Sequence, residues 1–126
     1  MPAWNDYKQA ARDRGSLALE LYVVESTPVK PEQLKEQLPA HLAYQGEQEK
    51  QDNLVFAGPL SDDTGEQMEG TGLIVYRAES LDAARAIAEA DPMHASGTRN
   101  FRIRRWLINE GSLQISVKLS QQEVRL

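Results

Sequence analysis

The sequence predicts an α+β domain built on an antiparallel sheet, and three observations predict it. Four segments alternate apolar and polar residues with the period of two that strands show, and two longer segments carry apolar residues at helical spacing. Glycines and prolines punctuate the chain between these segments. The segments follow one another as strand, helix, strand, strand, helix, strand, and 126 residues suffice for one domain with a modest core.

Two elements are expected before the first proline-rich loop. Trp4 and Ala11 lie on one face of a predicted helix over residues 3–14, which Gly15 ends. Alternation from 16 to 25, with residue types that favour extended backbone, predicts the first strand. We expect the string Ser26-Thr27-Pro28 to end that strand.

A longer helix with a proline inside it is expected over residues 32–51. Its apolar stripe, which we expect to face the core, consists of Leu34, Leu38, His41 and Leu42. Because a proline inside a helix removes a backbone donor, this helix should kink or restart at Pro39. A second strand is expected over 54–57, ended by Gly58 and Pro59.

The second half of the chain repeats the alternation of strand and helix. The polar segment 61–70 is expected to be a long exposed loop. A helix should begin after the N-cap Ser80 and run to about Ala90. The remaining predicted elements are a strand at 72–78, a strand at 98–108, an extra strand at 113–119 after Gly111, and a tail at 121–126 that frays or docks on a neighbour.

This order of elements is the ferredoxin-like βαββαβ plan, with an N-terminal helix and a C-terminal strand added. It divides the chain into a helical extension (1–16), a ferredoxin-like domain (17–109) and a C-terminal strand and tail (110–126). Helices on one side of such a sheet leave its other, apolar face bare. We therefore expect a second copy to cover that face, in a homodimer or a higher homo-oligomer.

Composition excludes several classes of function. A net charge of −5 and a pI near 5.0 argue against a nucleic-acid-binding protein. The chain has no cysteine, which excludes disulfides, thiol catalysis and zinc–thiolate sites. No apolar run approaches the roughly 20 residues that cross a bilayer, and no secretory signal opens the chain, so we expect a cytoplasmic protein with no membrane partner.

Several strings stand in a defined order: PAHLA at 39–43, VFAGPL at 55–60, ESLDAARAIAEADP at 79–92, then Gly97 and a strand that ends in Trp106. Together, from Leu17 to Leu107, they resemble the YciI-like family (YCII-related domain). The resemblance implies a dimeric α+β barrel, related in fold to muconolactone isomerases and cofactor-free monooxygenases. It also implies a site built from His41 and Asp91. One branch resembling this family eliminates halide from chlorinated hydroxyquinone-type substrates.

The strings around this site depart from the family pattern at three positions. Leu38 stands where an arginine often precedes the histidine string, and Met93 stands where an aromatic residue usually follows the Asp-Pro pair. His94 occupies a position that is often apolar. These departures indicate a divergent substrate or a different dimer surface.

The residues themselves allow a chemical and a structural interpretation of the pair. The imidazole of His41 can accept or donate a proton near neutral pH, and a carboxylate on one ring nitrogen would raise the basicity of the other. His41 is equally compatible with a hydrogen-bonded core histidine. Asp91 followed by Pro92 is also the pattern of a helix N-cap with proline at the first helical position. A capping carboxylate can still accept a bond from an imidazole.

Five further residues are candidates for substrate binding. His94, three residues after Asp91, is a second acid/base group or a surface histidine. Gly58 and Pro59 would allow the backbone to approach the site closely. Arg102 and Arg104 share one strand face that would hold an anion, or pair with the surplus carboxylates. No metal-ligand motif and no glycine-rich phosphate loop is present, so neither a metal nor a cofactor is assigned.

We therefore expect a cofactor-independent enzyme acting on a small, carboxylated or phenolic molecule. Isomerisation, elimination, dehalogenation or lactone chemistry suits a histidine acid/base, His41, with Asp91 as its orienting partner. The alternative is a non-catalytic binding or accessory dimer, in which His41 is a buried hydrogen-bonding residue. A third interpretation is a purely structural dimer.

Overall fold

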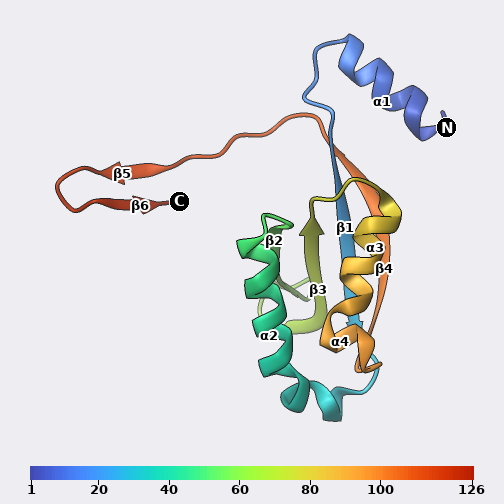
Figure 1. Cartoon of the computed structure of the whole chain (residues 1–126), viewed down its shortest axis with the longest axis vertical. Helices are drawn as coiled ribbons and strands as arrows, with labels where there is room; N and C mark the ends of the chain where they lie inside the picture. The colour runs from blue at the N-terminus through green and yellow to red at the C-terminus, as the bar shows by residue number, and fades with distance from the viewer. The chain divides into compact units, whose positions relative to one another are not determined.

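The computed structural model describes all residues from 1 to 126 (Figure 1). Two compact units are present, one formed by residues 20–106 and the other by 1–19 together with 107–126. In chain order the elements are α1 (Trp4–Asp13), β1 (Leu19–Pro28), the 3-10 turn η1 (Pro31–Gln33), α2 (Leu34–Lys50), β2 (Leu54–Ser61), β3 (Met68–Tyr76), α3 (Leu81–Ala90), α4 (Pro92–Ala95), β4 (Arg99–Ile108), β5 (Ser116–Lys118) and β6 (Glu123–Arg125).

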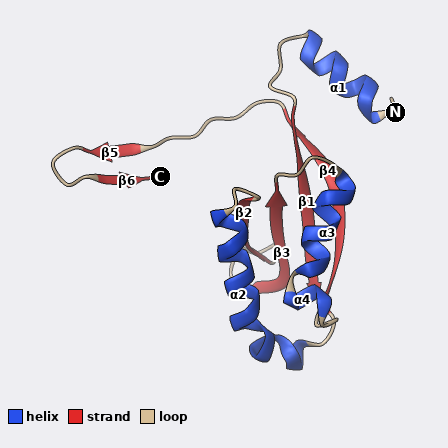
Figure 2. Cartoon of the chain, in the orientation of Figure 1, coloured by secondary structure: helices blue, strands red, loops and turns tan.

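Four strands form one sheet in the order β2-β3-β1-β4. The central strand β3 pairs antiparallel with both β1 and β2. Helices α2 and α3 lie side by side across one face of this sheet (Figure 2). Strand order and helix placement are those of the ferredoxin-like plan, so the predicted α+β fold is confirmed.

The core lies between this sheet and its helices. Tyr22 is opposite Tyr76 and Val24 is opposite Ile74 in the β1–β3 register, so all four side chains share one face. All four are at most 5% exposed. The helix and strand residues that complete the cluster are Ala84, Ala88 and Ile103. Two fully buried alanines on one side of α3 let this helix approach the sheet closely.

Two predicted strand ends are wrong because sheet pairing overrides the local break signal. β1 continues through Ser26 and Thr27 to Pro28, and buried Ser26 pairs with Gly72. β2 continues through Gly58 and Pro59. Since β2 is an edge strand, a proline without a backbone N–H is tolerated there.

The expected long loop between β2 and β3 is shorter than predicted. β2 ends at Ser61 and β3 already begins at Met68. Asp62 organises the remaining turn, because its Oδ1 accepts from the N–H groups of Thr64 and Gly65 and from the Thr64 hydroxyl. The hydroxyl bond from Thr64 lowers the pKa of Asp62.

Helix α2 differs from its prediction in continuity and in the face that it packs. It runs without a restart through Pro39. Leu38 and Leu42, expected to face the core, are 44% and 58% exposed. His41, the one polar member of the predicted stripe, does lie on the packed face, where it is joined by Tyr44 and Gln48. All three make hydrogen bonds to residues outside α2.

The terminal segments form the second unit. In the N-terminal part, Gly15 at φ 85° follows α1, and the Leu17 N–H donates to the Asn109 carbonyl at 3.2 Å. At the other end β5 pairs antiparallel with β6 in a separate two-stranded sheet. The predicted extra strand is therefore reduced to residues 116–118, and the expected frayed tail contains a strand. Neither terminal segment nor any other part of the chain contains a helix long and apolar enough to span a membrane.

Candidate active site

Asp91 sits at the junction of α3 and α4. Its backbone, at φ −60° and ψ 126°, leaves the helical conformation and so separates the two helices. Its Oδ1 accepts the Met93 N–H at 3.0 Å, and Pro92 occupies the first helical position. The predicted helix cap is therefore present. Asp91 is also fully buried, which is unusual for a carboxylate and requires polar partners.

The second partner of Asp91 comes from α2. The Nδ1 of His41 lies 2.8 Å from Oδ1 and 2.9 Å from Oδ2 of Asp91. Because a carboxylate accepts only, this geometry places the proton of a neutral His41 ring on Nδ1 and leaves Nε2 with a free lone pair. The His41 side chain is 18% exposed. A partly exposed imidazole oriented by a buried carboxylate has what a proton-transfer group requires.

Two tyrosine hydroxyls lie within electrostatic reach of Asp91. Burial raises the pKa of Tyr44 and of Tyr76, and the negative charge of Asp91 raises both further. The Tyr44 hydroxyl donates to the Ile87 carbonyl at 2.6 Å, which ties α2 to α3. The Tyr76 hydroxyl is buried and makes no hydrogen bond. Both phenols therefore remain protonated at neutral pH.

His94 is held by hydrogen bonds at both ring nitrogens. Its Nδ1 lies 2.7 Å from the Ala88 carbonyl, which can only accept, so Nδ1 carries the proton. Its Nε2 lies 2.8 Å from Ser26 Oγ and accepts the hydroxyl proton of that serine. The ring centroid is 4.7 Å from that of Phe101. Burial lowers the pKa of His94, which keeps the ring neutral. His94 is thus a part-buried structural group, and the alternative of a surface histidine is wrong.

Arg99 extends this arrangement into a chain of hydrogen bonds. Its Nε donates to Ser26 Oγ at 2.8 Å, and its Nη2 donates to the carbonyls of Ser26 at 2.7 Å and Gly70 at 2.5 Å. Arg99, Ser26, His94 and Ala88 are therefore linked in one series, which we call the Arg99–Ala88 chain. It connects β4 and β1 to the α3–α4 junction, where Asp91 lies.

Sequence reasoning missed four of these residues: Tyr44, Tyr76, Ser26 and Arg99. They lie on α2, β3, β1 and β4, and no short string joins them. The only available signal was the alternation of the strands, which places Tyr76 and Ser26 on the helix-covered face.

The other predicted substrate-binding residues lie on the sheet. Gly58 and Pro59 are exposed on β2, opposite Leu73 and Gly72, and no hydrogen bond joins them to the dyad. Arg104 forms an ion pair with Glu25 on the neighbouring strand, which is the salt bridge considered as an alternative to anion binding.

Two further positions complete the comparison of the predicted site with the structure. Arg102, the other arginine of the predicted anion-binding face, is exposed on β4. Met93, at one of the three departures from the family pattern, is only 4% exposed and belongs to the core.

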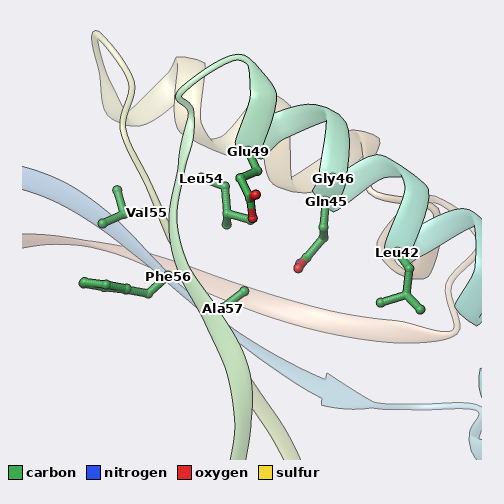
Figure 3. A pocket seen from close by; sticks show the side chains of 8 residues that line it. All are labelled: Leu42, Gln45, Gly46, Glu49, Leu54, Val55, Phe56 and Ala57. Carbon is green, nitrogen blue, oxygen red and sulfur yellow. The ribbon is translucent and has the colours of Figure 1, made fainter. Parts of the chain in front are cut away.

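A cavity of about 440 Å³ lies between α2 and β2 (Figure 3). Leu42, Glu49, Leu54 and Phe56 are among the side chains that line it. The lining includes neither His41 nor Asp91, although Leu42 directly follows His41. The chain has no cluster of three or more histidine, aspartate or glutamate side chains arranged to hold a metal ion.

Comparison with known proteins identifies a family and individual relatives that this chain resembles. Residues 18–107 match the family described as YCII-related domain. The uncharacterized protein YjpA of Bacillus subtilis (strain 168) is 32% identical over 76 residues, which cover 60% of this chain and 82% of YjpA. The 5-chloro-2-hydroxyhydroquinone dehydrochlorinase TftG of Burkholderia phenoliruptrix AC1100, in complex with 2,5-dihydroxybenzoquinone, superposes with a TM-score of 0.51. TftG is 20% identical over 68% of this chain and 92% of its own, a likeness that shows the fold alone.

Proposed function

This chain belongs to the YCII-related domain family, and on that premise we propose that it is a cofactor-independent, cytoplasmic enzyme that moves protons on a small anionic or phenolic molecule. The observation that carries the proposal is the pairing of the part-exposed His41 with the fully buried Asp91. A histidine with only a packing role in the core would need neither a partly exposed ring nor a hydrogen bond to a buried carboxylate.

His41 acts as the base through Nε2, and Asp91 acts through Nδ1. In an elimination, Nε2 takes a proton from the substrate, the electrons of the broken bond form a new double bond, and the leaving group departs with its own bonding pair. Asp91 holds the ring in the required tautomer and stabilises the imidazolium that forms. In an isomerisation, the imidazolium returns the proton to another atom of the substrate. Neither route requires a redox centre.

The proposed substrate class comes from the names of TftG and its ligand, and not from the shape of the cavity between α2 and β2. TftG is named for its action on 5-chloro-2-hydroxyhydroquinone and was captured with 2,5-dihydroxybenzoquinone. We extend to this chain only the class that these names share, a small hydroxylated ring. Gly58, Pro59 and Arg102 are the proposed contacts beyond the dyad. Because Arg102 alternates with the buried Ile103, it lies on the sheet face opposite the dyad and would serve a site that a second copy completes. His94 contributes by position and not by direct contact.

We propose that the working unit is a homodimer. The sheet face opposite the helices carries Phe56 and Trp106, which are 59% and 47% exposed. An apolar sheet face of this kind is normally covered. A second copy placed there gives the dimeric barrel that the family resemblance implies.

A specific observation also favours the alternative, a binding module without catalysis. The cavity between α2 and β2 is not lined by the dyad, and the Asp91 carboxylate also caps α4. In that case, His41 serves only to neutralise a buried carboxylate at a helix cap.

Selective chemical modification tests which interpretation holds. Diethyl pyrocarbonate acylates a histidine nitrogen with a free, reachable lone pair, and mass spectrometry locates the adduct. The chain has two histidines. We expect adducts on His41 and none on His94, and protection of His41 by 2,5-dihydroxybenzoquinone. An unmodified His41 would favour the binding-module interpretation.

Turnover tests the catalytic step directly. The chain is incubated with 5-chloro-2-hydroxyhydroquinone, and chloride release is measured. His41→Gln should reduce the rate about a hundredfold or more, as expected for the loss of an acid/base group. Lys35→Gln, at an exposed position on the same helix, should leave the rate unchanged. An unchanged rate in His41→Gln would contradict the proposal.

A further inference from the structure

Arg99 lies on the face of the sheet that carries the site of His41 and Asp91. It is an even number of positions from the buried Ile103, so both side chains share the helix-covered face, whereas Arg102 points to the other face. β4 begins at Arg99, at the end of the sheet where α4 follows α3 (Figure 1). Arg99 is therefore at the same end of the domain as Asp91.

The guanidinium of Arg99 is fixed by hydrogen bonds and still has unused donors. A guanidinium has five N–H groups. The Nε group donates to the Ser26 hydroxyl, and Nη2 donates to the carbonyls of Ser26 and Gly70, while Nη1 makes no hydrogen bond within the chain. Because the existing bonds fix the plane of the guanidinium, a ligand that accepts from Nη1 does not have to order this side chain first.

Arg99 also lacks a counter-ion of its own. Its acceptors are uncharged, its side chain is part-buried, and it forms no ion pair. The carboxylate of Asp91 acts on it only through space, because that carboxylate is bonded to His41 and to the Met93 N–H. Removing a charge from water is costly unless an opposite charge compensates for it. The position therefore favours an anion that contacts the guanidinium directly.

His94 does not compete with Arg99 for such an anion. Burial lowers the pKa of His94 and keeps its ring neutral, and both Arg99 and His41 lie within electrostatic reach of that ring. Arg99 and His41 therefore flank the same region of the domain. With both imidazoles neutral, the charges of Asp91 and Arg99 cancel, so an arriving anion meets no surplus of negative charge.

The sheet beside Arg99 carries only small side chains. Ser26 of β1 is opposite Gly72 of β3, which is opposite Pro59 of β2, so the three form one row on the helix-covered face. Gly72 adds no side chain to this row, and Pro59 at its outer end is exposed. No side chain of the row is larger than a proline ring, which leaves space above it for a small planar molecule.

We propose that Arg99 binds the carboxylate of a small hydroxylated ring compound, whose ring lies over the row of Ser26, Gly72 and Pro59. The carboxylate accepts from Nη1 in a charge-assisted hydrogen bond, and the ring extends toward Nε2 of His41. The inference rests on the proposed function, because it specifies the substrate class of the same site as a ring acid. His94 supports this subsite by holding the Ser26 hydroxyl to which Arg99 is bonded.

Two probes of similar shape and different charge test the inference on the native chain. One is 2,5-dihydroxybenzoate, and the other is 2,5-dihydroxybenzamide, in which a neutral amide replaces the carboxylate. We expect isothermal titration calorimetry to show about tenfold or more tighter binding of the benzoate, as a charge-assisted hydrogen bond provides. In the ¹⁵N-labelled chain, the benzoate should shift the Nε–H signal of Arg99, and the benzamide should leave it nearly unchanged.

Substitutions assign the preference for the benzoate to one arginine. Arg99→Gln should abolish the preference and leave the affinity for the benzamide unchanged. Arg99→Lys keeps the positive charge and should retain part of the preference. Arg85→Gln removes an exposed arginine of α3 and should retain all of it. If Arg99→Gln does not fold by circular dichroism, Arg99→Lys and the Nε–H signal of the native chain decide.

Two results would overturn the inference. The first is a native chain that binds the two probes equally or binds neither. The second is a preference for the benzoate that persists in Arg99→Gln or develops without a shift of the Arg99 signal. These outcomes do not depend on turnover. A preference that follows Arg99 without chloride release would leave the anion subsite standing and contradict the proposed catalysis, whereas turnover that requires His41 without any preference would do the reverse.

Discussion

The Nδ1 of His41 lies 2.8 Å from Oδ1 of Asp91, and the same Oδ1 accepts the Met93 N–H at 3.0 Å. One buried carboxylate therefore both starts α4 and orients the histidine of α2. The bond from the Met93 N–H holds the Asp91 carboxylate in position. The positioned carboxylate then determines which nitrogen of the His41 ring carries the proton. The same carboxylate oxygen of Asp91 serves both the helix cap and the proposed chemistry of His41. Substitutions must therefore be chosen so that they remove one role and keep the other.

Asp91→Asn and Asp91→Ala should differ in stability but not in activity. The asparagine oxygen can still accept from the Met93 N–H, so Asp91→Asn loses mainly the charge-assisted bond from His41, about 1.5–3 kcal/mol. Asp91→Ala also loses the helix cap, a further cost of about 1 kcal/mol. Urea unfolding measures the difference, and chloride release should be lost in both. Equal stabilities would show that the cap contributes nothing.

Tyr44 and Tyr76 offer a matched pair of hydroxyl deletions. The Tyr44 hydroxyl donates to the Ile87 carbonyl, so Tyr44→Phe should cost about 1 kcal/mol. The Tyr76 hydroxyl is buried without a partner, so Tyr76→Phe should be neutral or slightly stabilising. Thermal and urea unfolding of both variants test this contrast. A loss of stability in Tyr76→Phe as large as in Tyr44→Phe would reveal a partner for that hydroxyl.

The hydroxyl of Ser26 should matter well beyond its own strand. In Ser26→Ala, the Nε of Arg99 and the Nε2 of His94 both lose a partner at a part-buried position, at a cost of about 1 kcal/mol or more. Thr27→Ala, at the exposed neighbouring position, should stay within about 0.5 kcal/mol of the native chain. Amide hydrogen exchange at the α3–α4 junction should also increase in Ser26→Ala alone. Unchanged exchange there would mean that the Arg99–Ala88 chain does not hold the junction.

Local signals in the sequence predicted the second half of the domain well. Ser80 accepts the Ala83 N–H as the expected N-cap, and Asp91 with Pro92 starts α4 as expected. These signals act within three residues of one another and do not depend on the rest of the fold. The dyad was predicted from the family resemblance, because nothing local joins α2 to the α3–α4 junction.

Signals that depend on distant partners failed. Pro28 and the Gly58-Pro59 pair look like strand breakers, but β1 and β2 continue through or up to them because β3 pairs with both strands. In α2 the leucine pattern pointed to the wrong face, since the packed side chains are those that find hydrogen-bonding partners on other elements. Because the packed face of α2 is polar, the spacing of apolar residues in the sequence cannot reveal which face of the helix is packed.

The stability of the chain should fall as the pH is lowered from about 7 to 5, and His94 should account for part of the fall. Burial lowers the pKa of His94 below the ordinary value of 6.5, and nearby Arg99 and His41 lower it further. The bond to the Ala88 carbonyl and the charge of Asp91 act in the opposite direction but are weaker than burial. Below pH 6.5, the unfolded chain binds a proton at His94 that the folded chain does not bind, so unfolding becomes more favourable as the pH falls.

In His94→Asn this contribution is absent, and the amide N–H can still donate to the Ala88 carbonyl. Urea unfolding at a series of pH values should therefore show a smaller slope for His94→Asn than for the native chain, with Lys35→Gln as a control of unchanged slope. Equal slopes in all three proteins would mean that His94 binds its proton equally in the folded and unfolded chains, and that burial does not keep its ring neutral.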